Sequence, residues 1–153
     1  MSEQTIVELE YRTMKTEDYE ACARELILAF HGEPWNETWT YEQAWTRIDE
    51  MMSARVSRGY VIYDGDEVVS MLCGRIMTYL DWKELFIDEF SVSPTYQRQG
   101  IGSKMLDYVR SEMAKENIKY LVLNTEKGYS SQRFYEAYGF RIEESNIFMS
   151  RAV

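Results

Sequence analysis

The sequence is poor in several residue types, and each shortage excludes a class of protein. Its 153 residues include two cysteines, two prolines and one histidine. A single histidine, His31, excludes a multi-histidine metal site built from this chain alone, and we expect no bound metal. Cys22 and Cys73 lie far apart and follow no metal-ligand spacing, so we interpret them as buried free thiols.

Long apolar runs and an export signal are also missing. No stretch approaches the roughly 18 consecutive apolar residues that a membrane-spanning helix requires. The first ten residues carry three glutamates and no basic residue, which is unlike a secretory or transit peptide. We therefore expect a cytoplasmic protein with no membrane partner.

Positive charge is scarce relative to negative charge. The chain has 17 Lys and Arg residues against 26 Asp and Glu residues, which gives a formal net charge of −9. Nucleic-acid binding needs clustered Lys and Arg, so we expect no nucleic-acid partner. The acidic balance is compatible with a cationic substrate such as an amine, although solubility is the simpler explanation for most of the carboxylates.

The pattern along the chain predicts one domain over residues 1–153, because no Gly/Ser-rich linker or internal repeat divides it. The first half of the chain is predicted to begin with a strand over 6–12, followed by a helix opened by the hydroxyl of Thr16. A loop over 31–39 then leads to a second helix, capped by the box Thr40–Gln43. Three strands follow, over 60–63, 68–79 and 84–92. The pair Asp64-Gly65 is a hairpin turn signal.

The second half of the chain has a different order of elements. The strand over 84–92 leads through Pro94 into a glycine turn and a helix that carries Ile101 to Met113 on its inner side. A buried strand over 120–123 and a helix over 130–138 follow, and Phe140 is expected to begin a final strand region. An antiparallel half followed by a βαβ crossover predicts a mixed-sheet α/β or α+β domain.

The turn Gln97-Arg98-Gln99-Gly100-Ile101-Gly102 joins the end of a strand to the start of a helix. The first amides of a helix have no intrahelical acceptor and lie at the positive end of its dipole. Gly100 and Gly102 lack side chains, so an anion can approach the backbone closely, and Arg98 can add a charge-assisted contact. The turn therefore predicts a diphosphate site, with a ligand-free helix start as the alternative. It is neither a Walker loop nor a dinucleotide fingerprint, because the defining residues of both are missing.

Two segments together resemble a known family. Residues 90–102, FSVSPTYQRQGIG, resemble the signature of the GNAT superfamily of N-acetyltransferases, and residues 134–140, FYEAYGF, are similar to its FYxxxGF segment. The two motifs stand in the order and at the spacing that the family shows. The resemblance implies a mixed, mostly antiparallel sheet with a central, splayed parallel pair of strands, flanked by helices.

The resemblance also implies acetyl-CoA as co-substrate and direct attack of an amine on its thioester in a ternary complex. The strands 84–92 and 119–124 would splay apart to hold the pantetheine arm. The cofactor-binding residues expected on this basis are Phe90, Ser91, Val92, Gln97, Arg98, Gln99, Gly100, Ile101, Gly102, Ser103, Asn124 and Tyr135. One position departs from the family pattern: Gly128 stands where many members carry an asparagine, and Asn124 is the candidate substitute.

Acetyl transfer to an amine requires that the ammonium lose a proton and that the leaving thiolate gain one or be stabilised. The resemblance assigns the second task to Tyr135, for which a core aromatic with a satisfied hydroxyl is the alternative. For the base we favour Glu89, flanked by apolar residues that would raise its pKa, with Asp88 in reserve. The alternatives are that both carboxylates pair with basic residues or bind substrate ammonium groups, and that a water chain is the base.

Acidic and aromatic residues gather in the segments expected to border the acceptor. Carboxylates and indoles suit a cation through ion pairing and cation–π contact. The candidates are Glu33, Trp35, Glu37 and Trp39 in the loop over 31–39, with Tyr79 and Asp81 before the fourth strand; an ordered loop anchored by buried Trp rings is the alternative.

These residues favour a small cationic primary amine, similar to an aminoglycoside or a polyamine, as the acceptor. A protein or peptide acceptor, and a non-catalytic acyl-CoA-binding regulatory module, are the alternatives. A homodimer is compatible with the fold, and residues 146–153 are the segment that would contribute a strand to it.

Overall fold

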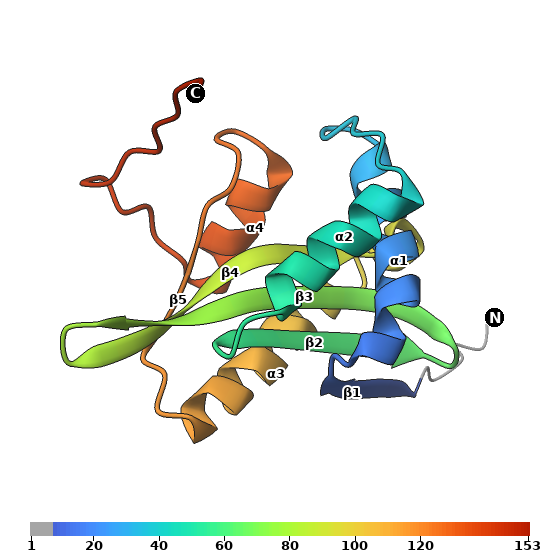
Figure 1. Cartoon of the computed structure of the whole chain (residues 1–153), viewed down its shortest axis with the longest axis horizontal. Coiled ribbons are helices and arrows are strands. Elements are labelled where there is room, and N and C mark those ends of the chain that lie inside the picture. Colours follow the sequence, from blue (N-terminus) through green and yellow to red (C-terminus); the bar gives the residue numbers. More distant parts are fainter. Residues whose placement is uncertain (1–7) are drawn as a thin grey trace.

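The computed structural model describes residues 8–153, which form a five-stranded sheet with helices on both faces (Figure 1). Ile6 and Val7, where the first strand was expected to begin, lie outside the described residues. The elements are β1 (Leu9–Thr13), α1 (Tyr19–His31), α2 (Tyr41–Met52), β2 (Ser57–Asp64), β3 (Glu67–Tyr79), β4 (Trp82–Val92), α3 (Ile101–Lys115), β5 (Tyr120–Leu123) and α4 (Ser130–Tyr138). None of the helices in this part of the chain is both long and apolar enough to cross a membrane.

The strands lie in the sheet in sequence order, from β1 to β5. Neighbouring strands are antiparallel except for β4 and β5, which run parallel and are joined through α3. The expected mixed α+β architecture is therefore confirmed. The parallel pair lies at the edge of the sheet, however, rather than at its centre, because no strand follows β5 among the described residues.

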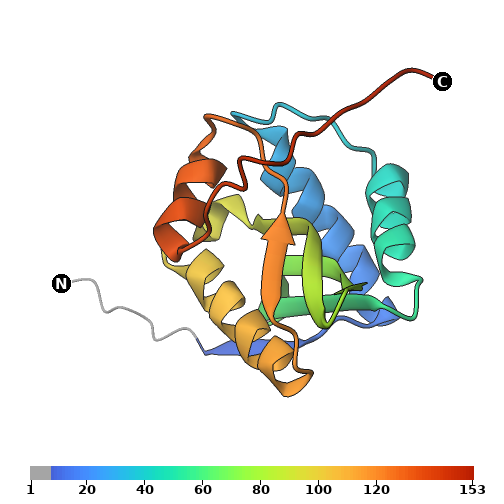
Figure 2. The ribbon, with the colours of Figure 1, turned by 90° about the vertical axis from the view of Figure 1, so that its left-hand side faces the viewer.

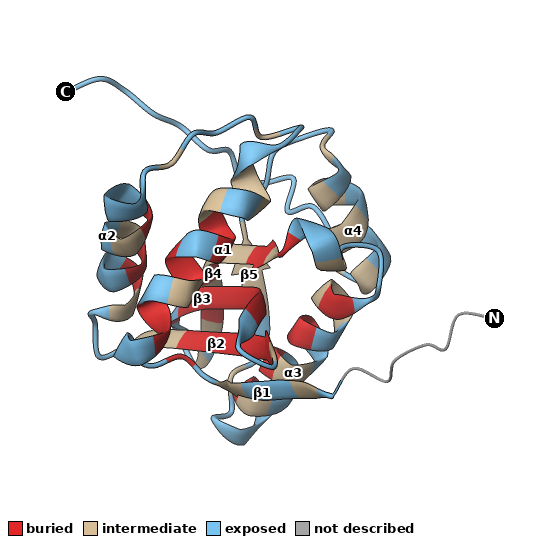
Figure 3. Ribbon diagram, turned by 90° about the vertical axis from the view of Figure 1, so that its right-hand side faces the viewer, coloured by how far each residue is buried: buried red, intermediate tan, exposed pale blue. Residues whose placement is uncertain are grey.

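Two hydrophobic cores lie on opposite faces of the sheet. Helices α1 and α2 cover one face, and α3 and α4 cover the other, as Figure 2 shows in a view along the sheet. The first core includes Leu26, Ile48 and Met71, and the second includes Leu85, Leu106 and Val109. Figure 3 shows the buried residues on the inner sides of the helices and along the central strands. Because both layers rest on one sheet, side chains from four helices can reach β4 and its neighbours.

Most local signals have the structure that the sequence predicts. The hydroxyl of Thr40 accepts a hydrogen bond from the amide of Gln43 at 3.1 Å, and the Gln43 side chain accepts one from the amide of Thr40 at 2.9 Å. Gly65 and Gly139 have φ values of 60° and 118°, which the hairpin turn and the end of α4 require. The expected cap at Thr16 is wrong: Thr16 is already the first residue of a short 3₁₀ turn whose N-cap is Lys15, and Asp18 accepts a hydrogen bond from the amide of Lys15 at 2.7 Å.

The expected final strand is also wrong. Residues 140–153 form no strand with the described part of the chain, in which two of their amides donate to backbone carbonyls, Phe140 to Tyr135 and Asn146 to Glu143. Figure 1 shows this segment leaving the end of α4 and ending away from the sheet. Within the described residues, this segment pairs with none of the five strands.

Candidate active site

Strand β4 separates from β5 halfway along its length. It pairs with β3 from Trp82 to Val92, but with β5 only from Glu84 to Ile87. The register with β3 shifts by one residue between Cys73 and Gly74, opposite Asp88. Such a bulge bends the strand and increases its twist, which takes the following residues away from β5. On that side, the backbone of residues 88–92 consequently pairs with no strand of the described chain, although the Val92 carbonyl accepts a hydrogen bond from Nε2 of Gln97 at 3.3 Å. This edge can therefore bind an extended ligand.

The predicted diphosphate turn lies directly after this free strand edge. Gly100 has a φ of 77° and is the N-cap of α3, and Arg98 has a φ of 65°, a conformation that costs a non-glycine residue free energy. No backbone acceptor is found, within the described residues, for the amides from Gln97 to Ser103. Nothing lies within 4 Å of the position that a Gly100 Cβ would take. The turn thus offers unpaired amides, the positive end of a helix and open space, which together fit a phosphate group.

The sequence suggested that Gly102 gives an anion access to the backbone, and the structure adds a second reason for a glycine, the packing of α3 against α4. A Cβ at this position would lie 2.9 Å from Cζ of Phe134 on α4, too close for a normal contact. The missing side chain therefore lets α3 and α4 approach each other, in addition to any access it gives an anion. This contact joins the two motifs that the sequence analysis singled out.

Tyr135 reaches the free edge of β4 from α4. Its ring lies 6.3 Å from that of Phe90 and 5.4 Å from those of Phe134 and Phe140. Burial, and secondarily the charge of Glu89, raise the pKa of the Tyr135 hydroxyl well above its usual value. The hydroxyl is therefore a protonated donor at neutral pH, and it lies close enough to Glu89 to be influenced by its charge.

Both candidate carboxylates on β4 form ion pairs. Oε2 of Glu89 accepts a hydrogen bond from Nε of Arg47 on α2 at 2.7 Å, and Asp88 accepts two from Arg75 on β3, at 2.8 and 2.9 Å. The Glu89 side chain is only 13% exposed. Burial raises the pKa of Glu89 above its usual value even though Arg47 acts in the opposite direction. The pairing alternative is thus present in the structure, while burial favours the protonated form of Glu89 more than in an exposed carboxyl group.

A third carboxylate lies beneath the same strand. Glu25 on α1 is 3% exposed, and its Oε2 accepts a hydrogen bond of 2.6 Å from the hydroxyl of Ser91. Its other oxygen has no hydrogen-bond partner among residues 8–153. Burial first, and then the charge of Glu89, raise the pKa of Glu25 to about 8, against the effect of Ser91. Ser91, expected at the cofactor, is therefore buried and directs its hydroxyl toward α1.

The loop between α1 and α2 contains four of the residues that the sequence analysis expects to bind the amine substrate. Trp35 packs edge-to-face on Phe30 and on Tyr129, at 5.3 and 5.1 Å, so the loop contacts the segment before α4. Nε1 of Trp39 donates to Glu37 at 2.9 Å. Trp35 is thus an anchor, as the alternative interpretation proposed, and Glu33 is exposed to solvent.

An open hollow of about 640 Å³ lies beside Glu37 and Trp39. Gln43, Thr46, Arg47 and Glu50 of α2 complete its wall. The Arg47 guanidinium lies 5.7 Å from the Trp39 ring and also pairs with Glu89. Arg47 therefore lines the hollow and at the same time contacts Glu89, the candidate base.

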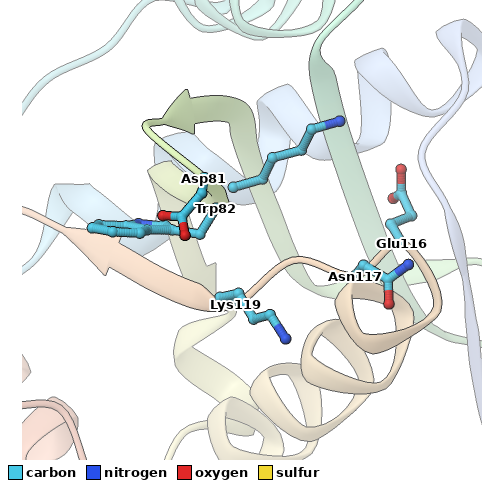
Figure 4. A pocket seen from close by; sticks show the side chains of 6 residues that line it. Asp81, Trp82, Glu116, Asn117 and Lys119 are labelled. Atoms are coloured by element: carbon cyan, nitrogen blue, oxygen red, sulfur yellow. The ribbon is translucent and has the colours of Figure 1, made fainter.

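The structure does not bring Tyr79 and Asp81 to this hollow. They lie at the β3–β4 hairpin, at the opposite end of β4 from the glycine turn. Asp81 and Trp82 instead line a separate hollow of about 450 Å³ with Lys83, Glu116, Asn117 and Lys119, as Figure 4 shows. An 11-residue strand spans roughly 35 Å, so a small acceptor cannot touch both ends at once.

Asn124 and Gly128 lie in the exposed connection from β5 to α4. Gly128 has a φ of 85°, a conformation that asparagine also adopts more readily than other residues, and its amide donates to Oε1 of Gln132 at 2.6 Å. Asn124 directly follows the last paired residue of β5, where the two strands separate. Its place at the splay fits the expected substitute role.

The sequence analysis did not identify Glu25 and Arg47, although the helical pattern places both on the apolar side of their helices. Glu25 stands three residues after Cys22, and Arg47 three residues after Ala44, so each charged residue occupies the apolar side of its helix. A charged side chain on a core-facing side needs a partner there. The partner itself, Ser91 or Glu89, belongs to a distant strand and is identified only by the fold.

The fold and the site define a domain that can hold a diphosphate group at the end of a splayed parallel strand pair. The model of the acetyltransferase (GNAT) family matches residues 20–140. The chain therefore belongs to the GNAT acetyltransferase family. Among curated proteins, no sequence matches this chain.

Solved structures share the fold at low sequence identity. A possible acetyltransferase from Clostridium difficile 630 is 19% identical, with a TM-score of 0.80 over 95% of this chain and 98% of its own. An aminoglycoside acetyltransferase from an uncultured soil metagenomic sample, in complex with sisomicin, is 14% identical, with a TM-score of 0.74 over 95% and 96%. AAC(6')-Iy, in complex with the bisubstrate analogue CoA-S-monomethyl-acetylneamine, is 15% identical, with a TM-score of 0.71 over 95% and 99%.

Proposed function

We propose that this protein is an acetyl-CoA-dependent N-acetyltransferase that acts on a primary amine of a small cationic acceptor. The observation that carries the proposal is the row of unpaired amides from Gln97 to Ser103, placed at the end of the free edge of β4. A diphosphate bound there and an extended arm along Phe90 to Val92 would bring a thioester close to Tyr135.

The residues at the splay have complementary roles in this reaction. The thioester supplies an acyl carbon that a neutral amine can attack directly, so that a C–N bond forms and the C–S bond breaks. Glu89, with its raised pKa, accepts a proton from the acceptor ammonium, directly or through water. Tyr135, protonated at neutral pH, donates a hydrogen bond or its proton to the leaving sulfur.

The acceptor preference rests on the hollow beside α2. Glu37, Glu50 and the Trp39 ring offer negative charge and an aromatic face to a cation, and the net charge of −9 attracts cations generally. Two structural neighbours, the metagenomic enzyme and AAC(6')-Iy, are solved with an aminoglycoside and with an acetylneamine-containing analogue. An aminoglycoside- or polyamine-like amine is therefore our proposed acceptor class.

The decisive experiment measures thermal unfolding with and without saturating acetyl-CoA. A ligand that binds only the folded state raises the midpoint, by about 2.7 kcal/mol of stability at a hundredfold excess over Kd. Gly100→Glu places a carboxylate at the turn, so we expect this variant to lose the shift. The apo variant also reports whether the substitution itself destabilises the fold.

An amine screen for acetyl transfer would follow a positive result. Binding of acetyl-CoA without turnover of small amines or peptides would replace the enzyme with an acyl-CoA-binding module. Turnover of peptides alone would overturn the acceptor class while retaining the reaction. No midpoint shift at millimolar acetyl-CoA would overturn the proposed function as a whole.

A further inference from the structure

One arginine, Arg47, belongs both to the hollow beside α2 and to the surroundings of the candidate base. It lines the hollow, and its Nε donates to Oε2 of Glu89 at 2.7 Å. The Arg47 side chain is 42% exposed and that of Glu89 is 13% exposed, so the arginine reaches the carboxylate from the solvent side. A molecule that enters the hollow therefore meets Arg47 next to the base.

The ion pair occupies only one oxygen of Glu89. Among residues 8–153, the Glu89 side chain accepts a hydrogen bond from Arg47 alone, and this bond uses Oε2. Oε1 of Glu89 accepts none, and it is not sealed from solvent as Oε1 of Glu25 is. One oxygen of the base is thus held in place, while the other can take a proton.

Arg47 is itself held by the loop before α2. Its guanidinium lies 5.7 Å from the Trp39 ring, whose Nε1 donates to Glu37 at 2.9 Å. The electrons of an indole face attract a cation, so the ring favours this position of the guanidinium. Because the guanidinium is planar, its orientation fixes the direction of the Nε hydrogen bond. The loop therefore helps to set the direction from which Arg47 meets Glu89.

The other ionisable groups around Glu89 carry no positive charge. They come from the loop before α2 and from four further elements: Glu25 on α1, Glu37 in the loop, Cys73 on β3, Asp88 on β4 and Tyr135 on α4. Burial raises the pKa of Glu89, and the hydrogen bond and charge of Arg47 lower it. Without Arg47, burial and the neighbouring carboxylates would favour a protonated Glu89, which cannot act as a base.

We propose that Arg47 is a positioning residue for acetyl transfer: it holds Oε2 of Glu89, keeps the carboxylate ionised and leaves Oε1 free for the acceptor ammonium. The inference rests on the proposed function, since it concerns the base of that reaction. The acceptor ammonium gives its proton to Oε1 of Glu89, and the neutral amine then attacks the thioester. Arg47 transfers no proton, because a guanidinium stays protonated.

The test is a carbon-13 NMR titration of the Glu89 carboxyl group, identified by its absence from the spectrum of Glu89→Gln. In Arg47→Met, which keeps an apolar side chain but no charge, we expect the pKa of Glu89 to rise by about one unit or more. The acidic limb of the kcat/KM profile should move to higher pH by the same amount. Arg47→Lys, which retains the charge, should reverse most of both shifts.

Arg75→Met is the matched control. Arg75 is 44% exposed and pairs with Asp88, the neighbour of Glu89 on β4, so this variant also removes one half-exposed cation from a carboxylate. We expect it to leave the Glu89 titration nearly unchanged, because the described contacts of Arg75 do not include Glu89. Thermal unfolding of each variant shows that it is folded under the conditions of the titration.

The outcomes separate this inference from the proposed function, because the NMR titration needs no acceptor. An unmoved Glu89 titration in Arg47→Met, or an equal shift in Arg75→Met, would overturn the role of Arg47. A moved titration with an unmoved kcat/KM profile would overturn it as well, since another group would then be the base. A moved titration in a protein that acetylates no amine would instead overturn the proposed function.

Discussion

Tyr135 reaches the candidate site from α4, whereas Glu89 lies on β4 and forms an ion pair with Arg47. We expect Tyr135→Phe and Glu89→Gln each to lower kcat by about 10²-fold or more, the usual contribution of a positioned acid or base. Glu89→Gln should also remove the acidic limb of the pH profile of kcat/KM. Steady-state kinetics with acetyl-CoA and an accepted amine measure both effects.

The control for Tyr135→Phe is Tyr138→Phe on the same helix. The Tyr138 hydroxyl donates to Asp107 at 2.6 Å, so its loss removes a hydrogen bond but no group near β4. We expect its kcat to stay within about twofold of the original value, since a single exposed hydrogen bond contributes little. Unchanged turnover after both Tyr135→Phe and Glu89→Gln would remove our catalytic assignment.

Glu25 makes the stability of the protein depend on pH. Its pKa rises from 4.5 to about 8 on folding, so the folded protein holds a proton that the unfolded chain releases. The contribution of this group is therefore fully present below about pH 4.5 and is lost as pH rises to about 8, by on the order of a few kcal/mol. Urea unfolding at about pH 5 and about pH 8 measures this loss.

Glu25→Gln isolates this contribution, because the amide cannot ionise. We expect the variant to gain stability relative to the original protein as the pH is raised between these values. Glu20→Gln, an exposed position on the same helix, should parallel the original protein. Parallel curves for Glu25→Gln as well would show that the Glu25 carboxyl keeps an ordinary pKa.

At the scale of elements, the contact between α3 and α4 depends on Gly102. Gly102→Ala places a Cβ 2.9 Å from the Phe134 ring, which is held by Phe90 and Tyr135. We expect a loss of about 1–3 kcal/mol in the free energy of unfolding, the usual cost of overpacking. Urea denaturation measures this loss.

A double-mutant cycle shows whether the ring causes the loss. Phe134→Leu combined with Gly102→Ala should recover part of the loss, because the smaller side chain relieves the contact. Gly100→Ala is the control: its Cβ meets nothing within 4 Å, so its cost comes from the φ of 77° and Phe134→Leu should not recover it. Additive effects of Gly102→Ala and Phe134→Leu would contradict the packing role.

At the scale of the whole molecule, β4 is the element that both layers of helices reach. Glu25 and Arg47 approach it from the α1–α2 layer, while Tyr135 and the glycine turn approach from the α3–α4 layer. The site is therefore formed where two otherwise separate hydrophobic cores share one strand. A change in either layer can alter the same few side chains on β4.

The sequence determined the features that depend on neighbouring residues. Capping residues, hairpin turns and apolar periodicity are local, which is why the box at Thr40, the turn at Gly65 and the helix that begins at Ile101 agree with the structure. The glycine turn and the FYEAYGF segment likewise identified the family correctly, because the amide geometry of a helix start follows from a few consecutive residues.

The tertiary structure alone decided which distant residues meet. Arg47 and Glu89 are 42 positions apart, and Glu25 and Ser91 are 66 apart, so their pairing depends on how the helices pack on the sheet. The same holds for the separation of Tyr79 and Asp81 from the loop over 31–39, and for the C-terminal segment that forms no strand in this chain. Strand pairing needs an available edge, and local sequence cannot specify which edge a distant segment will meet.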